Sequence, residues 1–214
     1  MTSDRDLLRR QFRAQRRRLT PRDRIEATAR FAAVAVRNRL LRPRLRIALY
    51  MPHGGEADPA ALLVAARALR CQIHFPIITN YRDSRMSFVR FECGDVLTCN
   101  RYGILEPSRR RTRQIPVRQL DLVLLPLVAV DEYGWRLGSG AGFYDRRFRH
   151  LRSGRLWRRP KLVGLAYDFQ RIARLAPQPW DVPLDAVLTE RDLYPARRIG
   201  EDRSNRNDET ETRK

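Results

Sequence analysis

Apolar residues recur along the chain with two different spacings, and these spacings predict where helices and strands lie. Over residues 4–19, apolar side chains such as Leu8 and Phe12 stand four apart, which is typical of a helix. A second helix is expected from Pro21 to about Leu41, because it follows a threonine and carries an acid three residues after that threonine. The apolar residues of this second helix follow helical spacing, so they are expected to form its buried stripe: Ile25, Ala29, Ala32, Ala33 and Val36.

Shorter apolar runs, bounded by polar or turn-forming residues, predict strands. These strands are expected over residues 45–51, 72–76, 86–91, 120–126, 159–166 and 184–188. Between them, two more helices are expected over residues 60–69 and 145–151. The remaining segments are expected to be a polar loop, a turn and an exposed linker, over residues 77–85, 102–107 and 108–118. Because strands alternate with helices, the pattern predicts an α/β fold: a three-layer open sheet, mostly parallel, with helices on both faces.

The length of 214 residues suits one domain with a short extension. Residues 1–195 are expected to form this single domain. Residues 196–214 are expected to be a polar, disordered tail, because the chain has almost no apolar residue after position 200.

The composition excludes several classes of protein. The chain contains no run of 18 apolar residues, so no membrane-spanning helix is predicted. The charged N-terminal segment does not resemble a secretory signal. The three cysteines, Cys71, Cys93 and Cys99, are odd in number and form no C-x-x-C pair, which argues against a disulfide framework or a zinc site. These features predict a cytoplasmic protein, and we expect it to be a monomer.

The formal net charge of +20 raises the possibility of nucleic-acid binding. However, all 44 basic residues except Lys161 and Lys214 are arginines, and they are spread along the whole chain. No zinc finger, recognition helix or aromatic RNA-binding motif accompanies them. We therefore expect no specific nucleic-acid partner, and the positive field would instead draw anionic small molecules inward.

The stretch from Arg136 to Asp145 holds the strongest chemical signal in the chain. Three of the 11 glycines stand here at alternate positions, after an apolar run and before an expected helix. Glycine allows positive φ angles and close approach of a ligand to the backbone, so such a loop can present N–H groups to phosphate. The spacing matches neither the Walker A nor the dinucleotide pattern, and a glycine-rich turn can also serve the fold alone.

Wider segments around this loop resemble one enzyme family. The segment from Asp121 to Asp145 resembles the signature of the 5-formyltetrahydrofolate cyclo-ligases, also called 5,10-methenyltetrahydrofolate synthetases. Three further segments look similar to this family in the same order along the chain: Arg5–Arg9 with Arg16–Pro21, Tyr50–Pro59, and Trp180–Thr189. The resemblance covers roughly residues 5 to 190.

The resemblance implies an ATP-dependent ligase of folate metabolism. In that family ATP phosphorylates the formyl oxygen of 5-formyltetrahydrofolate, the N10 nitrogen attacks the activated carbon, and 5,10-methenyltetrahydrofolate, ADP and phosphate are released. The partners implied are 5-formyltetrahydrofolate and ATP, with Mg²⁺ as cofactor and no membrane. Three positions depart from the family's pattern. Arg5 stands where the family often has lysine, Ala141 where some members have lysine, and Tyr102 where some members have tryptophan.

The resemblance also implies a role for individual residues. The ATP-binding positions are Arg5, Arg9, Arg136, Leu137, Gly138, Ser139, Gly140, Ala141, Gly142, Phe143 and Tyr144. The folate-binding positions are Met51, Glu56, Tyr102, Ser139, Gly140, Ala141, Gly142 and Phe143. The catalytic positions are Arg136, Tyr144 and Asp145. The positions that match magnesium ligands are Asp145 and Asp185.

Simpler explanations exist for some of these residues. Arg9 could lie on a solvated helix face, Glu56 could cap a loop, and Tyr102 could pack in the fold instead of stacking on folate. Two rival functions also remain open. Phosphosugar isomerases and acyl-CoA transferases have similar α/β sheets and would act without ATP, and a non-catalytic RNA-binding or regulatory relative would show no turnover.

Overall fold

A central sheet organises the part of the chain that the computed structural model describes, which is residues 4–108, 114–151 and 160–197. Its eight strands run in the order β13-β12-β10-β7-β1-β2-β3-β6. Their bounds in that order are Leu193–Pro195, Ala186–Leu188, Lys161–Leu165, Leu122–Pro126, Arg46–Ala48, Gln72–Asn80, Arg85–Arg90 and Gln114–Ile115. The five strands from β12 to β2 are parallel, and β13, β3 and β6 pair antiparallel at the edges.

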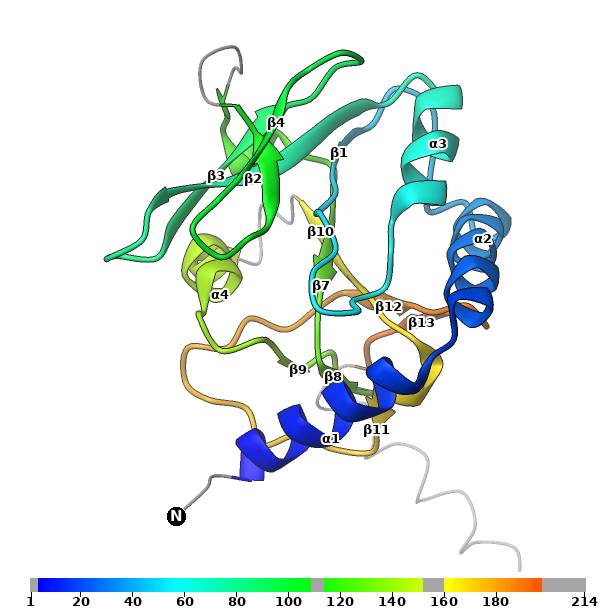
Figure 1. Ribbon diagram of the computed structural model, residues 1–214, viewed down its shortest axis with the longest axis vertical. Coiled ribbons are helices and arrows are strands. Elements are labelled where there is room, and N and C mark those ends of the chain that lie inside the picture. Colours follow the sequence, from blue (N-terminus) through cyan, green and yellow to red (C-terminus); the bar gives the residue numbers. More distant parts are fainter. Residues whose placement is uncertain (1–3, 109–113, 152–159, 198–214) are drawn as a thin grey trace, which may run out of the picture.

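Helices cover both faces of this sheet (Figure 1). On one face, α2 (Pro21–Arg37) and α3 (Ala60–Ala68) pack over Leu122 and Leu124 of β7. On the other, α4 (Phe143–Phe148) places Phe148 against Val123 and Leu125 of the same strand. Successive residues of a strand point to opposite faces, so one apolar run fills both cores. The predicted three-layer, mostly parallel α/β fold is confirmed.

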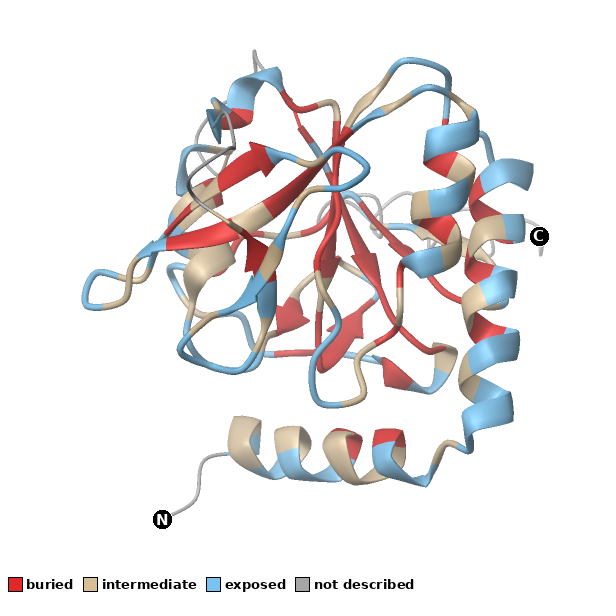
Figure 2. Ribbon diagram, turned by 45° about the horizontal axis from the view of Figure 1, so that its top comes forward, coloured by how far each residue is buried: buried red, intermediate tan, exposed pale blue. Residues whose placement is uncertain are grey.

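Two small sheets complete the described structure. One has the order β11-β8-β9, with bounds Arg171–Ile172, Ala129–Asp131 and Arg136–Leu137. The other pairs β4 (Leu97–Cys99) with β5 (Leu105–Pro107). Helix α1 (Asp4–Arg18) lies near β8 (Figure 1), and its few buried positions face the rest of the molecule (Figure 2). Phe12 packs in a small separate core with Val128, Ala129, Leu137 and Leu175. In the described ranges, no helix is long and apolar enough to cross a membrane.

The predicted helix starts agree well with the structure. Thr20 caps α2, with its hydroxyl accepting from the Asp23 N–H and the Asp23 carboxylate accepting from the Thr20 N–H. Such a reciprocal cap satisfies two amides that a helix end leaves unpaired. The predicted stripe of α2 is wrong, however, because Ile25 and Val36 are 71% and 53% exposed. The buried face is centred on the larger side chain of Phe31, with Ala27, Val34 and Ala35 beside it.

Several strand predictions also need correction. Residues 77–80 continue β2, where Ile77 and Ile78 are buried, so the polar loop predicted from residue 77 is wrong at its start. Residues 105–107 form β5 instead of a turn. Of the predicted exposed linker, residues 109–113 lie outside the described residues. The remainder is not exposed throughout, because β6 joins the main sheet and Val117 is buried.

The antiparallel strand β13 and the β8–β9 hairpin have no counterpart in the prediction. Their two or three residues are too few to create a periodic pattern. Most of the predicted polar tail, residues 198–214, lies outside the described residues.

The turn of the β8–β9 hairpin depends on a glycine. Gly134 has a φ of +82°, and a Cβ at this position would lie 2.4 Å from the carbonyl oxygen of Leu184. We expect Gly134→Ala to lower the free energy of unfolding by about 2 kcal/mol, because both the backbone angle and the contact become strained.

Denaturant unfolding of this variant beside Gly94→Ala would separate the two causes. Gly94 also has a positive φ, of +89°, but no atom lies within 4 Å of its Cβ position. Equal losses of stability in the two variants would contradict a packing role for Gly134.

Candidate active site

A cavity of about 420 Å³ opens where β1 and β7 end. Tyr50 and Met51 follow β1, and Pro126 is the last residue of β7. Ligands of open α/β sheets gather at such carboxyl ends of strands. Its lining residues are spread along the chain: Tyr50, Met51, His53 and Glu56; Pro76 and Ile78; Met86; Asn100, Tyr102 and Ile104–Glu106; Pro126; and Arg136 with Gly138–Asp145.

Residues 138–142, called the glycine loop below, form one wall of this cavity. The loop joins β9 to α4, and Gly140 and Gly142 have φ angles of +119° and +67°. Within the described ranges, no acceptor receives a hydrogen bond from the amide N–H groups of this loop. A run of unpaired N–H groups in a concave backbone is suited to an anion such as phosphate.

An ion pair closes the base of the glycine loop. Arg136, just before the loop, donates from Nη2 to Oδ1 of Asp145, just after it, over 2.7 Å. Arg136 also donates from Nη1 to the Val182 carbonyl over 2.6 Å, and the Val182 N–H donates to Asp145 over 3.2 Å. The side chains are only 4% and 19% exposed. Sequence reasoning treated these residues as separate ligands, whereas the structure joins them to each other.

Arginines of α1 approach the same loop from outside the cavity lining. Arg9 donates from Nε to the Gly138 carbonyl over 3.0 Å, and Arg13 donates from Nη2 to the Ser139 carbonyl over 3.2 Å. Arg5 pairs with Asp181 over 3.0 Å. Leu137 is fully buried in the core that contains Phe12, so only its backbone is available to a ligand at the loop.

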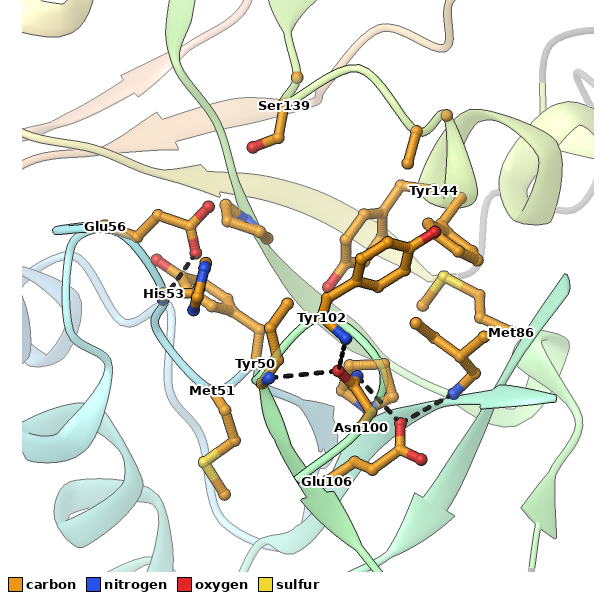
Figure 3. A pocket seen from close by; sticks show the side chains of 18 of the residues that line it. Tyr50, Met51, His53, Glu56, Met86, Asn100, Tyr102, Glu106, Ser139 and Tyr144 are labelled. Carbon is orange, nitrogen blue, oxygen red and sulfur yellow. Dashed lines mark hydrogen bonds between the residues drawn. The ribbon is translucent and has the colours of Figure 1, made fainter. Parts of the chain in front are cut away.

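Glu56 lines the cavity from the loop that follows β1, beside His53 (Figure 3). Its Oε2 accepts a hydrogen bond from the His53 N–H over 3.1 Å. Burial raises the pKa of Glu56, and this is partly opposed by that hydrogen bond and by the charges of Arg16 and Arg13. Glu56 therefore offers a desolvated carboxylate to a ligand that carries N–H donors.

Aromatic side chains form the wall nearest α4. Tyr102 meets Phe143 edge-on, with ring centroids 6.2 Å apart, and it also contacts Tyr81 at 5.5 Å. Tyr102 is 47% exposed, so part of its ring remains available to a ligand. Tyr144 stacks on Phe148, and burial raises the pKa of its hydroxyl. This hydroxyl therefore stays protonated at neutral pH and can donate a hydrogen bond.

Apart from Tyr102, the sequence did not indicate the part of the cavity wall that is formed by β2 and the β4–β5 ribbon. Asn100 donates from Nδ2 to Oε2 of the buried Glu106 over 3.3 Å, and this oxygen also accepts from the Ile78 N–H over 3.1 Å. These bonds fix the β4–β5 ribbon against β2. The lone Asn and Glu carry no spacing signal, because only the tertiary pairing brings them to the cavity.

Most of the residues implied by the resemblance line this one cavity. They are Met51, Glu56, Tyr102, Arg136, Gly138, Ser139, Gly140, Ala141, Gly142, Phe143, Tyr144 and Asp145. Four others do not line it: Arg5, Arg9, Leu137 and Asp185. Among these four, Arg9 still contacts the glycine loop directly.

The two aspartates proposed as metal ligands differ in position. Asp185 stands just before β12, where its Oδ2 accepts from the Leu162 N–H over 2.7 Å, and it does not line the cavity. Asp145 does line it, and the hydrogen bonds of the described residues all use its Oδ1. In these ranges, no three His, Cys, Asp or Glu side chains form a metal cluster. One carboxylate is sufficient for Mg²⁺ that arrives with a nucleotide, so Asp145 fits this ion.

Comparison with known proteins agrees with these features. A sequence model described as the 5-formyltetrahydrofolate cyclo-ligase family matches residues 1–190. The 5-formyltetrahydrofolate cyclo-ligase of Escherichia coli is 33% identical over 145 residues, which cover 67% of this chain and 76% of that protein. The enzyme of the same name from Haemophilus influenzae is 33% identical over 144 residues, or 66% and 74% of the two chains.

Solved structures of similar proteins share the fold. A 5,10-methenyltetrahydrofolate synthetase from Aquifex aeolicus has a TM-score of 0.71 and 27% identity, covering 91% of this chain and 94% of that one. Another from Mycoplasma pneumoniae has a TM-score of 0.68 and 25% identity, covering 88% and 99%.

Proposed function

The chain belongs to the 5-formyltetrahydrofolate cyclo-ligase family, and we propose that its reaction takes place in the cavity between the glycine loop and Glu56. The protein is an ATP-dependent ligase that cyclises 5-formyltetrahydrofolate to 5,10-methenyltetrahydrofolate. The observation that best supports this location is the glycine loop itself, which lines the same cavity as a desolvated carboxylate and has amides that no acceptor in the described structure uses.

The chemistry consists of a phosphoryl transfer followed by ring closure. The formyl oxygen attacks the terminal phosphorus of ATP, and the bond to ADP breaks. The lone pair of the N10 nitrogen then adds to the activated formyl carbon, this nitrogen loses its proton, and phosphate departs with the former formyl oxygen. No side chain has to act as a nucleophile, so the protein contributes chiefly positioning and charge stabilisation.

ATP phosphates are assigned to the glycine loop and the groups around it. Backbone N–H groups of Gly138 to Gly142 would donate to phosphate oxygens, since no other acceptor in the described structure uses them. Arg136 stands just before the loop and pairs with Asp145 just after it, so it fixes the base of the loop and places a positive charge there. Tyr144 keeps its proton and would donate to a phosphate or formyl oxygen.

The folate ring is assigned to the side of Glu56 and the aromatic wall. The two oxygens of a carboxylate can accept from the adjacent N–H groups of a pterin amide and amine. Met51 and the exposed part of Tyr102 offer apolar and aromatic surface for the flat ring. Pterin binding between these residues would direct the formyl group toward the glycine loop.

Magnesium is assigned to Asp145 alone. A bound Mg²⁺ would neutralise charge on the ATP phosphates, as it does in other phosphoryl-transfer sites. Asp145 would contribute Oδ2, because Oδ1 already accepts from Arg136 and Val182. We do not include Asp185, because its carboxylate binds the backbone of β10.

One assay tests the proposed activity against its rivals. The protein is incubated with 5-formyltetrahydrofolate and Mg-ATP, and the ultraviolet absorbance of the methenyl product is followed. Product formation that requires ATP supports the proposal. Activity on phosphosugars or acyl-CoA without ATP, or tight RNA binding without turnover, would instead favour one of the two alternatives.

The raised pKa of Glu56 predicts a pH effect on folate use. Below its pKa a carboxyl group is protonated and neutral, so folate binding is lost as the pH falls through that pKa. Because burial raises it, this acidic limb of kcat/KM for folate should lie above the ordinary value of 4.5.

The pH profile of Glu56→Gln provides the control, because glutamine does not titrate. We expect the kcat/KM of this variant for folate to be lower than that of the parent protein and to show no decline at acidic pH. An identical limb in the variant and the parent protein would contradict the assignment to Glu56.

A further inference from the structure

Four arginines share one face of α1, and one of them is only half-buried and forms no ion pair with a described residue. Arg5, Arg9, Arg13 and Arg16 stand four, four and three residues apart, which places them along a single side of a helix. Within the proposed function, we infer that the guanidinium of Arg13 is an additional phosphate-binding group. It would contact the terminal phosphate of ATP at the point where the glycine loop approaches the folate side.

The other three arginines of this face already have structural partners. Arg5 pairs with Asp181, and Arg9 pairs with Asp6 over 2.7 Å while also donating to the Gly138 carbonyl. Arg16 is only 2% exposed and donates from Nη1 toward the Leu127 carbonyl over 3.5 Å. These three side chains have a structural role, because their contacts hold α1 against the rest of the molecule.

Arg13 differs from these three in its bonding. Its single hydrogen bond among the described residues goes from Nη2 to the Ser139 carbonyl over 3.2 Å, and no described carboxylate forms an ion pair with it. A guanidinium has five N–H donors, so most of those on Arg13 stay available. The side chain is also only half-buried, so it can change rotamer without breaking a core contact.

Arg13 contacts one half of the proposed site and is electrostatically coupled to the other. Ser139 belongs to the glycine loop, which would hold ATP. On the other side, the charge of Arg13 is felt by Glu56, where it helps to lower a pKa that burial raises. A cation that contacts the loop and is also electrostatically coupled to Glu56 lies near the path of the transferred phosphoryl group.

This location predicts what Arg13 would do during the reaction. A phosphate oxygen is a stronger acceptor for a guanidinium than a neutral carbonyl, because the hydrogen bond is then charge-assisted. Arg13 would therefore exchange the Ser139 carbonyl for the terminal phosphate when ATP binds. Removal of this contact should affect ATP use and turnover more than folate affinity.

The test compares three variants of the full-length protein. Arg13→Ala is expected to reduce kcat/KM for ATP about 10- to 100-fold, in line with loss of a hydrogen bond to a charged group. Arg13→Lys should recover part of this loss, since it keeps the charge without the planar fork. Arg18→Ala is the matched control and should match the parent protein, because this exposed arginine lies on nearly the opposite side of α1.

Thermal unfolding without nucleotide identifies a merely structural role. The inference predicts that Arg13→Ala unfolds at nearly the parent temperature, while its KM for ATP rises or its kcat falls. It is overturned if Arg13→Ala has parent-like kinetics for ATP, or if a lower Tm accompanies equal losses for ATP and folate that lysine does not rescue. Failure of the proposed function would look different, because the parent protein itself would then form no methenyl product.

Discussion

Replacing either Arg136 or Asp145 alone is expected to reduce turnover severely and to destabilise the fold, whereas replacing both should restore stability without restoring activity. The two side chains form a largely buried ion pair at the base of the glycine loop. Loss of one partner leaves the other charge uncompensated, which costs about 3 kcal/mol or more in a buried setting. Each single variant should also reduce kcat by roughly 1000-fold, because the loop amides lose their alignment and the phosphates lose charge stabilisation.

A double-mutant cycle measures both effects. Arg136→Met, Asp145→Asn and the double variant are compared by denaturant unfolding and by formation of the methenyl product. Asp145→Asn should be the less stable single variant, since the Arg136 side chain is 4% exposed and that of Asp145 is 19% exposed. Additive stability losses would contradict the ion pair, and an active double variant would contradict its role in catalysis.

Replacing Glu56 with glutamine is expected to reduce kcat/KM for folate about 100-fold, while KM for ATP changes little. Glutamine keeps the shape of the side chain, but it places an amide N–H₂ where the proposal needs an acceptor. The loss of a charged hydrogen bond, together with one mismatched donor, is worth roughly 2–3 kcal/mol, which corresponds to this factor.

Glu92→Gln serves as the matched control for this variant. Glu92 is exposed, pairs with Arg90 and does not line the cavity. We expect it to keep parent-like kinetics for both substrates. A Glu56→Gln variant with unchanged use of folate, or with a larger effect on ATP than on folate, would contradict the assignment of Glu56 to the pterin.

The fold was predictable where the sequence is periodic. Continuous apolar runs such as Leu122–Pro126 fill both faces of the sheet, and the Thr20 cap marks the start of α2 without tertiary information. Prediction failed where a few residues pair with distant strands, as in β6 and β13. It also failed on the orientation of α2, because the bulk of Phe31 outweighs the smaller apolar residues on the other side.

The candidate site divides in a similar way. The glycine loop carries a local signal, and the family resemblance indicated Glu56, so both were predicted before their shared cavity was known. Asn100 and Glu106 reach this cavity only through the pairing of β4 with β5, which no local pattern reveals. The ion pair between Arg136 and Asp145 was missed for a different reason: sequence gives the charge of a residue but not the partner that satisfies it.

The central claim is that the amides of the glycine loop bind the phosphates of ATP, and amide NMR tests this most directly. The glycine signals of a chain with 11 glycines can be assigned and followed while Mg-ATP is added. We predict large shifts for Gly138, Gly140 and Gly142 and none for Gly94, which lies in a turn outside the cavity lining. If saturating Mg-ATP, with folate present, left these three signals unmoved, the phosphate site would have to lie elsewhere.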